Sequence, residues 1–146
     1  MEIEINGMDE LKKKLKELEN LGDQEIMAKI GDEGVKIIVE RTLSGKDVDH
    51  GTFINYSNEY MKQKKKGNPP NLKDRGEMLA TVKGRVTDGL TVSVQANTDV
   101  GLRHQAGIGK MPIRRWFGLD HSADVDKIKE LFEKLMTVKI EKKWNR

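Results

Sequence analysis

The sequence contains no cysteine in its 146 residues. Disulfide bonds, zinc sites built on thiolates and a cysteine nucleophile are therefore excluded. Hydrophobic runs are short, and none approaches the roughly 18 residues that a membrane-spanning helix needs. The acidic start, residues 1–10, has no apolar core of the signal-peptide kind, so we expect the chain to reside in a cytosol.

Aromatic residues are also scarce, at 5% of the chain. Hydrophobic residues make up 36% and charged residues 35%, and the mean hydropathy is −0.69. This composition predicts a single domain, 1–146, with a small core and long solvated helices or a disordered segment. The net charge of +3 is a mild excess that is compatible with nucleic-acid binding without indicating it.

Two helices are predicted in the N-terminal part, 8–43. Residues 1–7 alternate and favour a short strand, and apolar residues at helical spacing then predict helices over 8–21 and 24–42. Gly31 and Gly34 fall inside the second helix, where each costs about 1 kcal/mol relative to alanine. We expect another element to approach the helix closely at these glycines.

Residues 44–75 are predicted to form a long, mobile loop, because their apolar residues are sparse and follow no period. One helical turn is expected at 57–65. A basic run there could contact a partner or phosphates, although a solvated loop is an equal alternative. The lysines of this run are Lys62, Lys64, Lys65 and Lys66.

The strongest strand signal is a β-hairpin over 76–97, with a turn at Asp88-Gly89. Val92 and Val94 should face the core, and Ser93 the wetter face. A short helix over 100–106 and a C-terminal helix over 122–136 follow, while 137–146 fit either a strand or a longer helix. Segregated helices and strands of this kind predict an α+β fold, with the last helix packed on a small sheet.

The segment 104–119 concentrates unusual residue types between these elements. One interpretation buries Ile113 and Phe117 and leaves the arginines solvated. The other presents an exposed Arg–Trp face to a partner, since both residues are enriched at interface hot spots. The interface residues would be Lys110, Arg114, Arg115 and Trp116, and the residues that shape the turn His104, Gln105, Gly107, Gly109 and Pro112.

Catalytic machinery is not evident in the sequence. No phosphate-binding glycine loop occurs, and His50, His104 and His121 are not at metal-ligand spacing. No nucleophile or base stands beside a partner group that would activate it. We therefore expect no enzyme, no cofactor and no metal; a metal-dependent hydrolase is a distant alternative.

Several motifs together resemble the tailed-phage virion morphogenesis family, which comprises Mu-type and P2-type tail-completion proteins and head–tail joining proteins. The similarity covers roughly residues 52–136 and is most specific at His-Gln-x-Gly (104–107) followed by Pro-x-Arg (112–114). Other matching parts are Ser57-Asn58-Glu59-Tyr60 before the lysines, the stretch 72–79, and Trp116-Phe117-Gly118-Leu119.

The resemblance implies a structural virion component that acts at the neck or tail terminus, made in the host cytoplasm and incorporated in the virion. Such proteins assemble as rings, commonly hexamers, and contact the head connector or adaptor and the tail tube or tail terminator. The alternative function is a small basic nucleic-acid-binding protein that would use 62–66, Arg114, Arg115 and the tail 142–146. Direct nucleic-acid contact is possible but not favoured, and no membrane association is expected.

Overall fold

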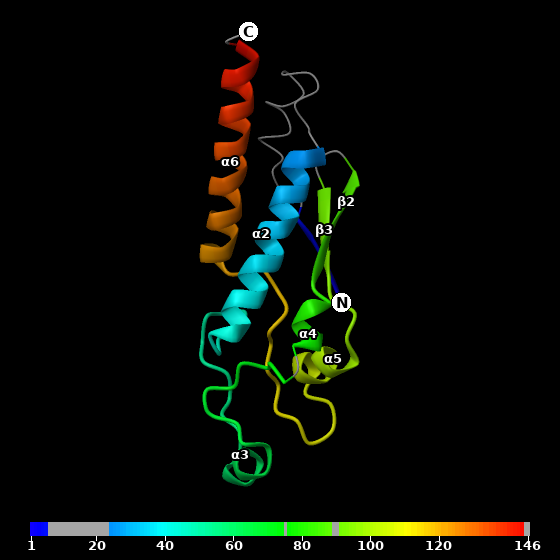
Figure 1. Cartoon of the computed structure of the whole chain (residues 1–146), viewed down its shortest axis with the longest axis vertical. Coiled ribbons are helices and arrows are strands. Elements are labelled where there is room, and N and C mark those ends of the chain that lie inside the picture. The colour runs from blue at the N-terminus through cyan, green and yellow to red at the C-terminus, as the bar shows by residue number, and fades with distance from the viewer. Residues whose placement is uncertain (6–23, 75, 89–90, 145–146) are drawn as a thin grey trace.

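The computed structural model describes residues 1–5, 24–74, 76–88 and 91–144 (Figure 1). It has helices packed on a small antiparallel sheet, so the predicted α+β class is confirmed. The predicted helix over 8–21 lies outside the described residues. In chain order the elements are β1 (Glu2–Ile5), α2 (Gln24–Leu43), α3 (Asn58–Lys64), α4 (Glu77–Ala80), β2 (Lys83–Asp88), β3 (Thr91–Gln95), α5 (Asp99–Ala106) and α6 (Ser122–Trp144).

The sheet has three antiparallel strands in the order β1–β3–β2. The predicted N-terminal strand is confirmed as β1, which pairs with β3 so that Ile3 lies opposite Val94. On the other side of β3, Gly84 of β2 lies opposite the same Val94. The N-terminus of the chain therefore completes a sheet whose other two strands are the predicted hairpin.

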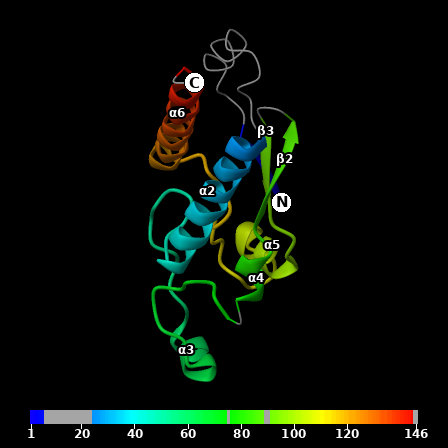
Figure 2. The same ribbon diagram turned by 45° about the horizontal axis from the view of Figure 1, so that its top comes forward.

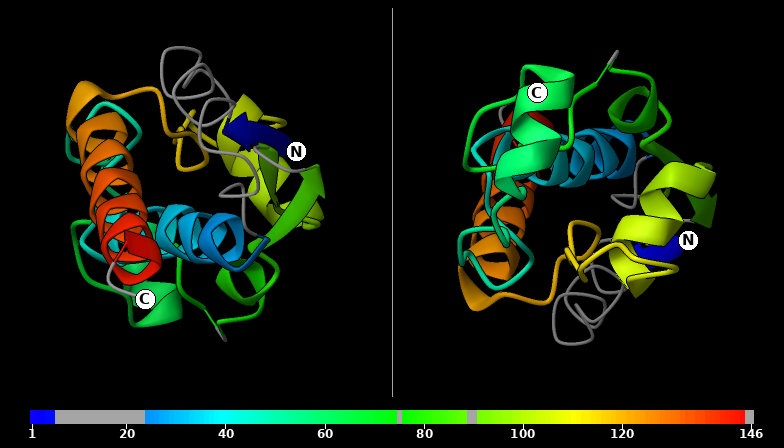
Figure 3. Two further views of the ribbon diagram at one scale, coloured as in Figure 1. Left: turned by 90° about the horizontal axis from the view of Figure 1, so that it is seen from above. Right: turned by 90° about the horizontal axis from the view of Figure 1, so that it is seen from below.

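Helix α2 lies between the sheet and α6 in all the views (Figures 1, 2 and 3). Its predicted apolar residues, Ile26, Ile30, Ile37 and Ile38, are all buried. Burying one such side chain contributes about 1.5–3 kcal/mol relative to leaving it exposed. The helix thus supplies the middle layer of the core. The last helix, α6, packs on α2, whereas the sequence predicted that it packs on the sheet.

The close approach expected at the α2 glycines is confirmed. A Cβ atom on Gly84 of β2 would lie 3.0 Å from the Cα and carbonyl carbon of Gly31. A Cβ atom on Gly31 would in turn lie 2.7 Å from Cγ2 of Val92. The helix and the sheet therefore touch backbone to backbone at this point.

Helix α6 is longer than predicted, since it continues past residue 136 to Trp144. Met136 is buried, and Ile140, one turn further on, packs against the core. These residues extend the apolar stripe of Phe132, which explains why 137–144 continue the helix and do not form a strand.

The hairpin begins later than predicted. Residues 77–80 form α4, and the first strand starts at Lys83. Val92 and Val94 are buried as expected, but the prediction that Ser93 faces water is wrong, because this side chain is fully buried in the central strand. Its hydroxyl donates a 2.6 Å hydrogen bond to Oε1 of Glu2, so β1 supplies the partner that water would otherwise provide.

The segment 44–75 contains the expected helical turn, α3, which is capped by the Ser57 hydroxyl accepting from the backbone N–H of Tyr60. The segment is anchored elsewhere by Val48, Phe53 and Leu72, which are buried in the protein interior. Its mobility stays a prediction, but it is attached to the core at points on both sides of α3.

We predict that Gly84→Ala destabilises the protein by about 1–3 kcal/mol, because the added methyl group overpacks the contact with the α2 backbone. Urea denaturation of the full chain measures the change. Gly67→Ala is the matched control, since a Cβ atom there meets nothing within 4 Å, and it should be neutral or slightly stabilising. Equal effects of the two substitutions would show that the α2–sheet contact is looser than described.

Candidate functional site

Side chains of the segment 113–116 alternate between two faces as predicted, but the face expected to be exposed is buried and the face expected to be buried is exposed. Arg114 is 4% exposed and Trp116 0%, whereas Ile113 is 56% exposed. Arg115 is exposed, as both interpretations allow. The expectation of an exposed Arg–Trp face is therefore wrong, and so is the expectation that Ile113 anchors the core.

Trp116 is buried because its ring fits against a glycine of α5. Its Nε1–H donates a 2.8 Å hydrogen bond to the carbonyl of Gly101. A Cβ atom on Gly101 would lie only 2.6 Å from Cζ2 of the indole ring. Trp116 therefore joins this segment to α5 and is not available to a partner.

Gln105 holds the turn as predicted. Its Oε1 accepts from the backbone N–H of Trp116 at 3.0 Å and of Phe117 at 3.1 Å, and its Nε2 donates to the Phe117 carbonyl at 3.0 Å. Gly107 ends α5 with φ +66, and Gly109 follows with φ +76. This left-handed backbone is one that glycine adopts without strain.

Arg114 lies on the buried side of this segment. Its Nε donates to the carbonyl of Ile54 at 2.9 Å and its Nη2 to that of Asn55 at 3.4 Å. The guanidinium carbon lies 5.0 Å from the ring centre of Tyr56. Among the described residues no carboxylate pairs with this guanidinium, and its Nη1 has no hydrogen-bond partner there. Burial lowers the pKa of Arg114.

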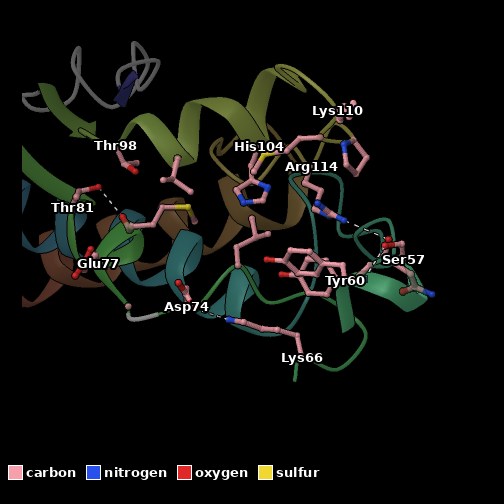
Figure 4. A pocket seen from close by; sticks show the side chains of 18 of the residues that line it. Ser57, Tyr60, Lys66, Asp74, Glu77, Thr81, Thr98, His104, Lys110 and Arg114 are labelled. Carbon is pink, nitrogen blue, oxygen red and sulfur yellow. Dashed lines mark hydrogen bonds and ion pairs between the residues drawn. The ribbon is translucent and has the colours of Figure 1, made fainter. Parts of the chain in front are cut away.

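A cavity of about 800 Å³ opens beside Arg114 (Figure 4). It lies between the segment around α3, helices α4 and α5, and the loop that follows α5. Its apolar lining includes Leu72, Met78, Val100, Met111 and Pro112, and its hydroxyl-bearing lining Tyr56, Ser57, Tyr60, Thr81 and Thr98. The arrangement can enclose a ligand that is partly apolar.

His104 lines the same cavity and lies near Arg114 (Figure 4). Burial and the neighbouring Arg114 charge lower its pKa to about 4. The imidazole is therefore neutral at pH 7, and its Nδ1 is buried without a hydrogen-bond partner among the described residues. Its backbone carbonyl accepts from the Arg114 N–H at 2.7 Å, so the expected structural role belongs to the main chain.

The predicted basic residues are spread over different surfaces. Lys62, Lys64 and Lys65 are exposed on α3 and its C-terminal end, away from the lining of the cavity. Lys66 lines the cavity and pairs with Asp74 at 3.1 Å. Lys110 is exposed on the cavity rim, and Glu77 also contributes to the lining. The structure thus brings Lys66 and Lys110 together with Arg114, but not the other lysines.

A second polar cluster, outside the predicted site, lies where α2, α6 and the loop 44–53 meet. Arg41 Nη1 donates to Asp124 Oδ2 at 2.7 Å, and its Nη2 to the carbonyls of Trp116 at 2.8 Å and Gly118 at 2.9 Å. His50 Nε2 lies 2.9 Å from the other Asp124 oxygen. The arrangement joins four parts of the chain and fixes their relative positions. The buried pair of Arg41 and Asp124 at its centre is here called the lock.

Few features of the sequence indicate the residues that matter most in these two clusters. Arg41 and Asp124 lie 83 residues apart, and no motif of the sequence connects them. Tyr56 is next to the predicted helical turn but was not singled out. Arg41 and Asp124 are recognised as a pair only from their contact in the folded structure. Arg114, in contrast, belongs to the Pro-x-Arg motif of the sequence.

Comparison of the chain with protein-family models, with curated proteins and with solved structures gives no match. Within the described part of the chain, no helix combines the length and hydrophobicity needed to cross a membrane. The same residues contain no group of histidine and carboxylate side chains placed to hold a metal ion. What the site does is therefore argued from its geometry.

We predict that Asp124→Asn destabilises the protein by about 3–5 kcal/mol, because it leaves the buried Arg41 charge without its partner. Thermal or urea unfolding measures the loss. The control is Asp49→Asn, which breaks an exposed pair with Arg115 of 3.5 Å and should cost less than about 1 kcal/mol. Comparable losses would show that the buried pair does not act as a lock.

We also predict that stability falls as the pH drops from about 6.5 to about 4, since His104 in the unfolded chain takes up a proton there and in the folded chain does not. The full effect is about 3 kcal/mol. Carboxylates titrate in the same range, so His104→Gln provides the comparison, and its stability should fall less steeply over this window. Parallel curves for the two proteins would contradict a buried, neutral His104.

Proposed function

We propose that this chain is a structural virion morphogenesis protein of a tailed phage or prophage, which acts at the neck in tail completion or head–tail joining. The observation that supports it is an apolar surface on α5 and the following loop. Among the described residues, ten large hydrophobic side chains are exposed, and five of them fall within residues 100–113. They are Val100, Leu102, Ile108, Met111 and Ile113, here called the 100–113 surface.

Exposed apolar side chains concentrated in one stretch of the chain, here α5 and the loop after it, favour a docking function. The loop that carries them is held in one conformation, because the Arg114 N–H binds the His104 carbonyl and Gln105 binds the backbone of 116–117. Ile113 packs over Gly107, where a Cβ atom would lie 2.5 Å from its Cγ1. A surface that is ordered before it binds loses less conformational entropy on docking, which suits an assembly protein.

Two exposed cations accompany this surface. Lys110 lies within the loop, and Arg115 lies two residues after Ile113 with its side chain about half exposed. Both suit carboxylates on a neighbouring subunit or virion protein. In this proposal the chain forms a ring, with a hexamer as the expected state, between the head connector or adaptor and the tail tube or tail terminator. It is made in the host cytoplasm and ends up in the virion.

Nucleic-acid binding is the second candidate, and the exposed lysines of α3 favour it. Lys62 and Lys64 lie on this helix, which projects at the end of the molecule away from the C-terminus of α6 (Figure 1). Burial of Arg114 removes one of the phosphate contacts on which this function depended. Binding through phosphates would weaken steeply as salt is raised, so a salt titration with duplex DNA tests it.

The double substitution Ile108→Ser and Ile113→Ser should leave thermal unfolding of the free chain nearly unchanged, because both side chains are more than half exposed. Assembly, followed as self-association in sedimentation or as yield of infectious particles, should fall at least about tenfold, which corresponds to roughly 1.4 kcal/mol. Val138→Ser on α6 is the control, since it removes an exposed apolar side chain elsewhere. Normal assembly of the double variant would show that the 100–113 surface is not a docking surface.

The function itself is tested by deleting the gene from the phage or prophage that encodes it. Filled heads and free tails should accumulate unjoined, and the purified chain should restore joining when it is added to the lysate. Infectious particles in normal number after deletion would contradict a role in tail completion or head–tail joining.

A further inference from the structure

The cavity beside Arg114 holds a buried positive charge without a partner carboxylate among the residues described. Removing a guanidinium from water costs several kcal/mol unless an anion compensates it. The carbonyls of Ile54 and Asn55 and the Tyr56 ring offset part of this cost. They leave Nη1 without a hydrogen-bond partner among the described residues, so the cavity is suited to receive an anion.

Two carboxylates of the chain itself line the cavity, but neither is within ion-pair distance of Arg114 in the described structure. Asp74 pairs with Lys66 at 3.1 Å, and Glu77 lies in the first turn of α4. The remaining cation of the lining, Lys110, adds to the positive charge at the rim. An incoming anion therefore meets a positive end of the cavity at Arg114 and Lys110.

The lining of the cavity fits a ligand that is larger and more apolar than a simple anion. Leu72, Met78, Val100 and Met111 are apolar, and about 800 Å³ exceeds what a phosphate or acetate ion would fill. Ligand sites of about 300–1,000 Å³ typically surround an apolar ligand with a few directed polar groups. The ligand that fits is a carboxylate attached to an apolar body, with two buried nitrogen-bearing side chains, Arg114 and His104, at its charged end.

The position of the cavity favours a protein segment as its source. Val100 and Met111 belong both to the cavity lining and to the 100–113 surface. A partner docked on that surface can therefore extend directly into the cavity. We propose that the cavity receives a glutamate or aspartate side chain, flanked by apolar residues, from a partner protein, and that its carboxylate binds Nη1 of Arg114.

This inference rests on the proposed docking role of the 100–113 surface, but the binding can be measured on the full chain alone. The probe is an equimolar mixture of peptides Ac-Xxx-Glu-Xxx-Xxx-NH2, in which Xxx is leucine, isoleucine, valine or phenylalanine. The matched mixture carries glutamine in place of glutamate. Amide NMR shifts of residues 104–114 and calorimetry should show the glutamate mixture binding at least tenfold more tightly.

Variants locate the charge that is responsible. Arg114→Lys keeps a cation but loses the guanidinium geometry, and the preference for glutamate over glutamine should fall about tenfold or disappear. Arg85→Lys is the matched control, because this arginine of β2 is exposed and does not line the cavity, and the variant should bind both mixtures as the parent does. Circular dichroism checks that both variants are folded.

His104 gives a readout that needs no substitution at Arg114. A carboxylate bound beside the guanidinium offsets its charge, so the pKa of His104, about 4 in the free chain, should rise when the glutamate mixture binds. The glutamine mixture should leave it unchanged. The charge of Arg114 lowers the pKa of His104. The other charged side chains of the lining are present in both measurements; they are Lys66, Asp74, Glu77 and Lys110.

Equal binding of the glutamate and glutamine mixtures, or none by either, would overturn the inference, and so would acetate binding as tightly as the glutamate mixture. The proposed function would still stand in these cases if the Ile108 and Ile113 substitutions impair assembly. Conversely, the chain could bind the glutamate mixture selectively while phage particles form normally after gene deletion. That pair of results would support a site for an acidic segment and contradict the virion role.

Discussion

The buried ion pair between Arg41 and Asp124 is the interaction on which the rest of this structure depends. It joins the last turn of α2 to the first turn of α6, and the same guanidinium binds the carbonyls of Trp116 and Gly118. A buried pair gains little net stability over apolar packing, but it tolerates few alternative arrangements. Its effect is therefore to fix how α6 and the segment 114–119 lie against α2.

The arrangement of the candidate site follows from that constraint. With the Trp116 carbonyl directed to Arg41 and its indole directed to Gly101, the extended backbone turns Arg114 inward and Ile113 outward. Arg114 then closes one end of the cavity, and Ile113 lies over Gly107. The inward position of Arg114 in the cavity and the exposed position of Ile113 on the 100–113 surface are thus two consequences of one anchored segment.

Local signals in the sequence predicted most of the elements, but they did not identify which distant residues contact one another. The isoleucines of α2, the hairpin and the helix after Thr98 were predicted from spacing and capping, which depend on neighbours in the chain. The pairing of Arg41 with Asp124 was not predicted, because the two residues lie 83 positions apart and no local pattern connects them. The faces of 113–116 were assigned wrongly for the same reason: the rule that places isoleucine inside and arginine outside fails where carbonyls and a tyrosine ring receive the arginine.

Burial of Arg114 also separates the two candidate functions by physical behaviour. The exposed lysines of α3 would act on phosphates through solvent, where salt screens charges over about 10 Å at 0.1 M. A carboxylate bound to Arg114 inside the cavity is screened far less and must match the apolar lining as well as the charge. An interaction of this kind discriminates among partners instead of attracting any polyanion. Selectivity for one neighbour is what ordered assembly requires, and the geometry of this site therefore agrees better with docking than with nucleic-acid binding.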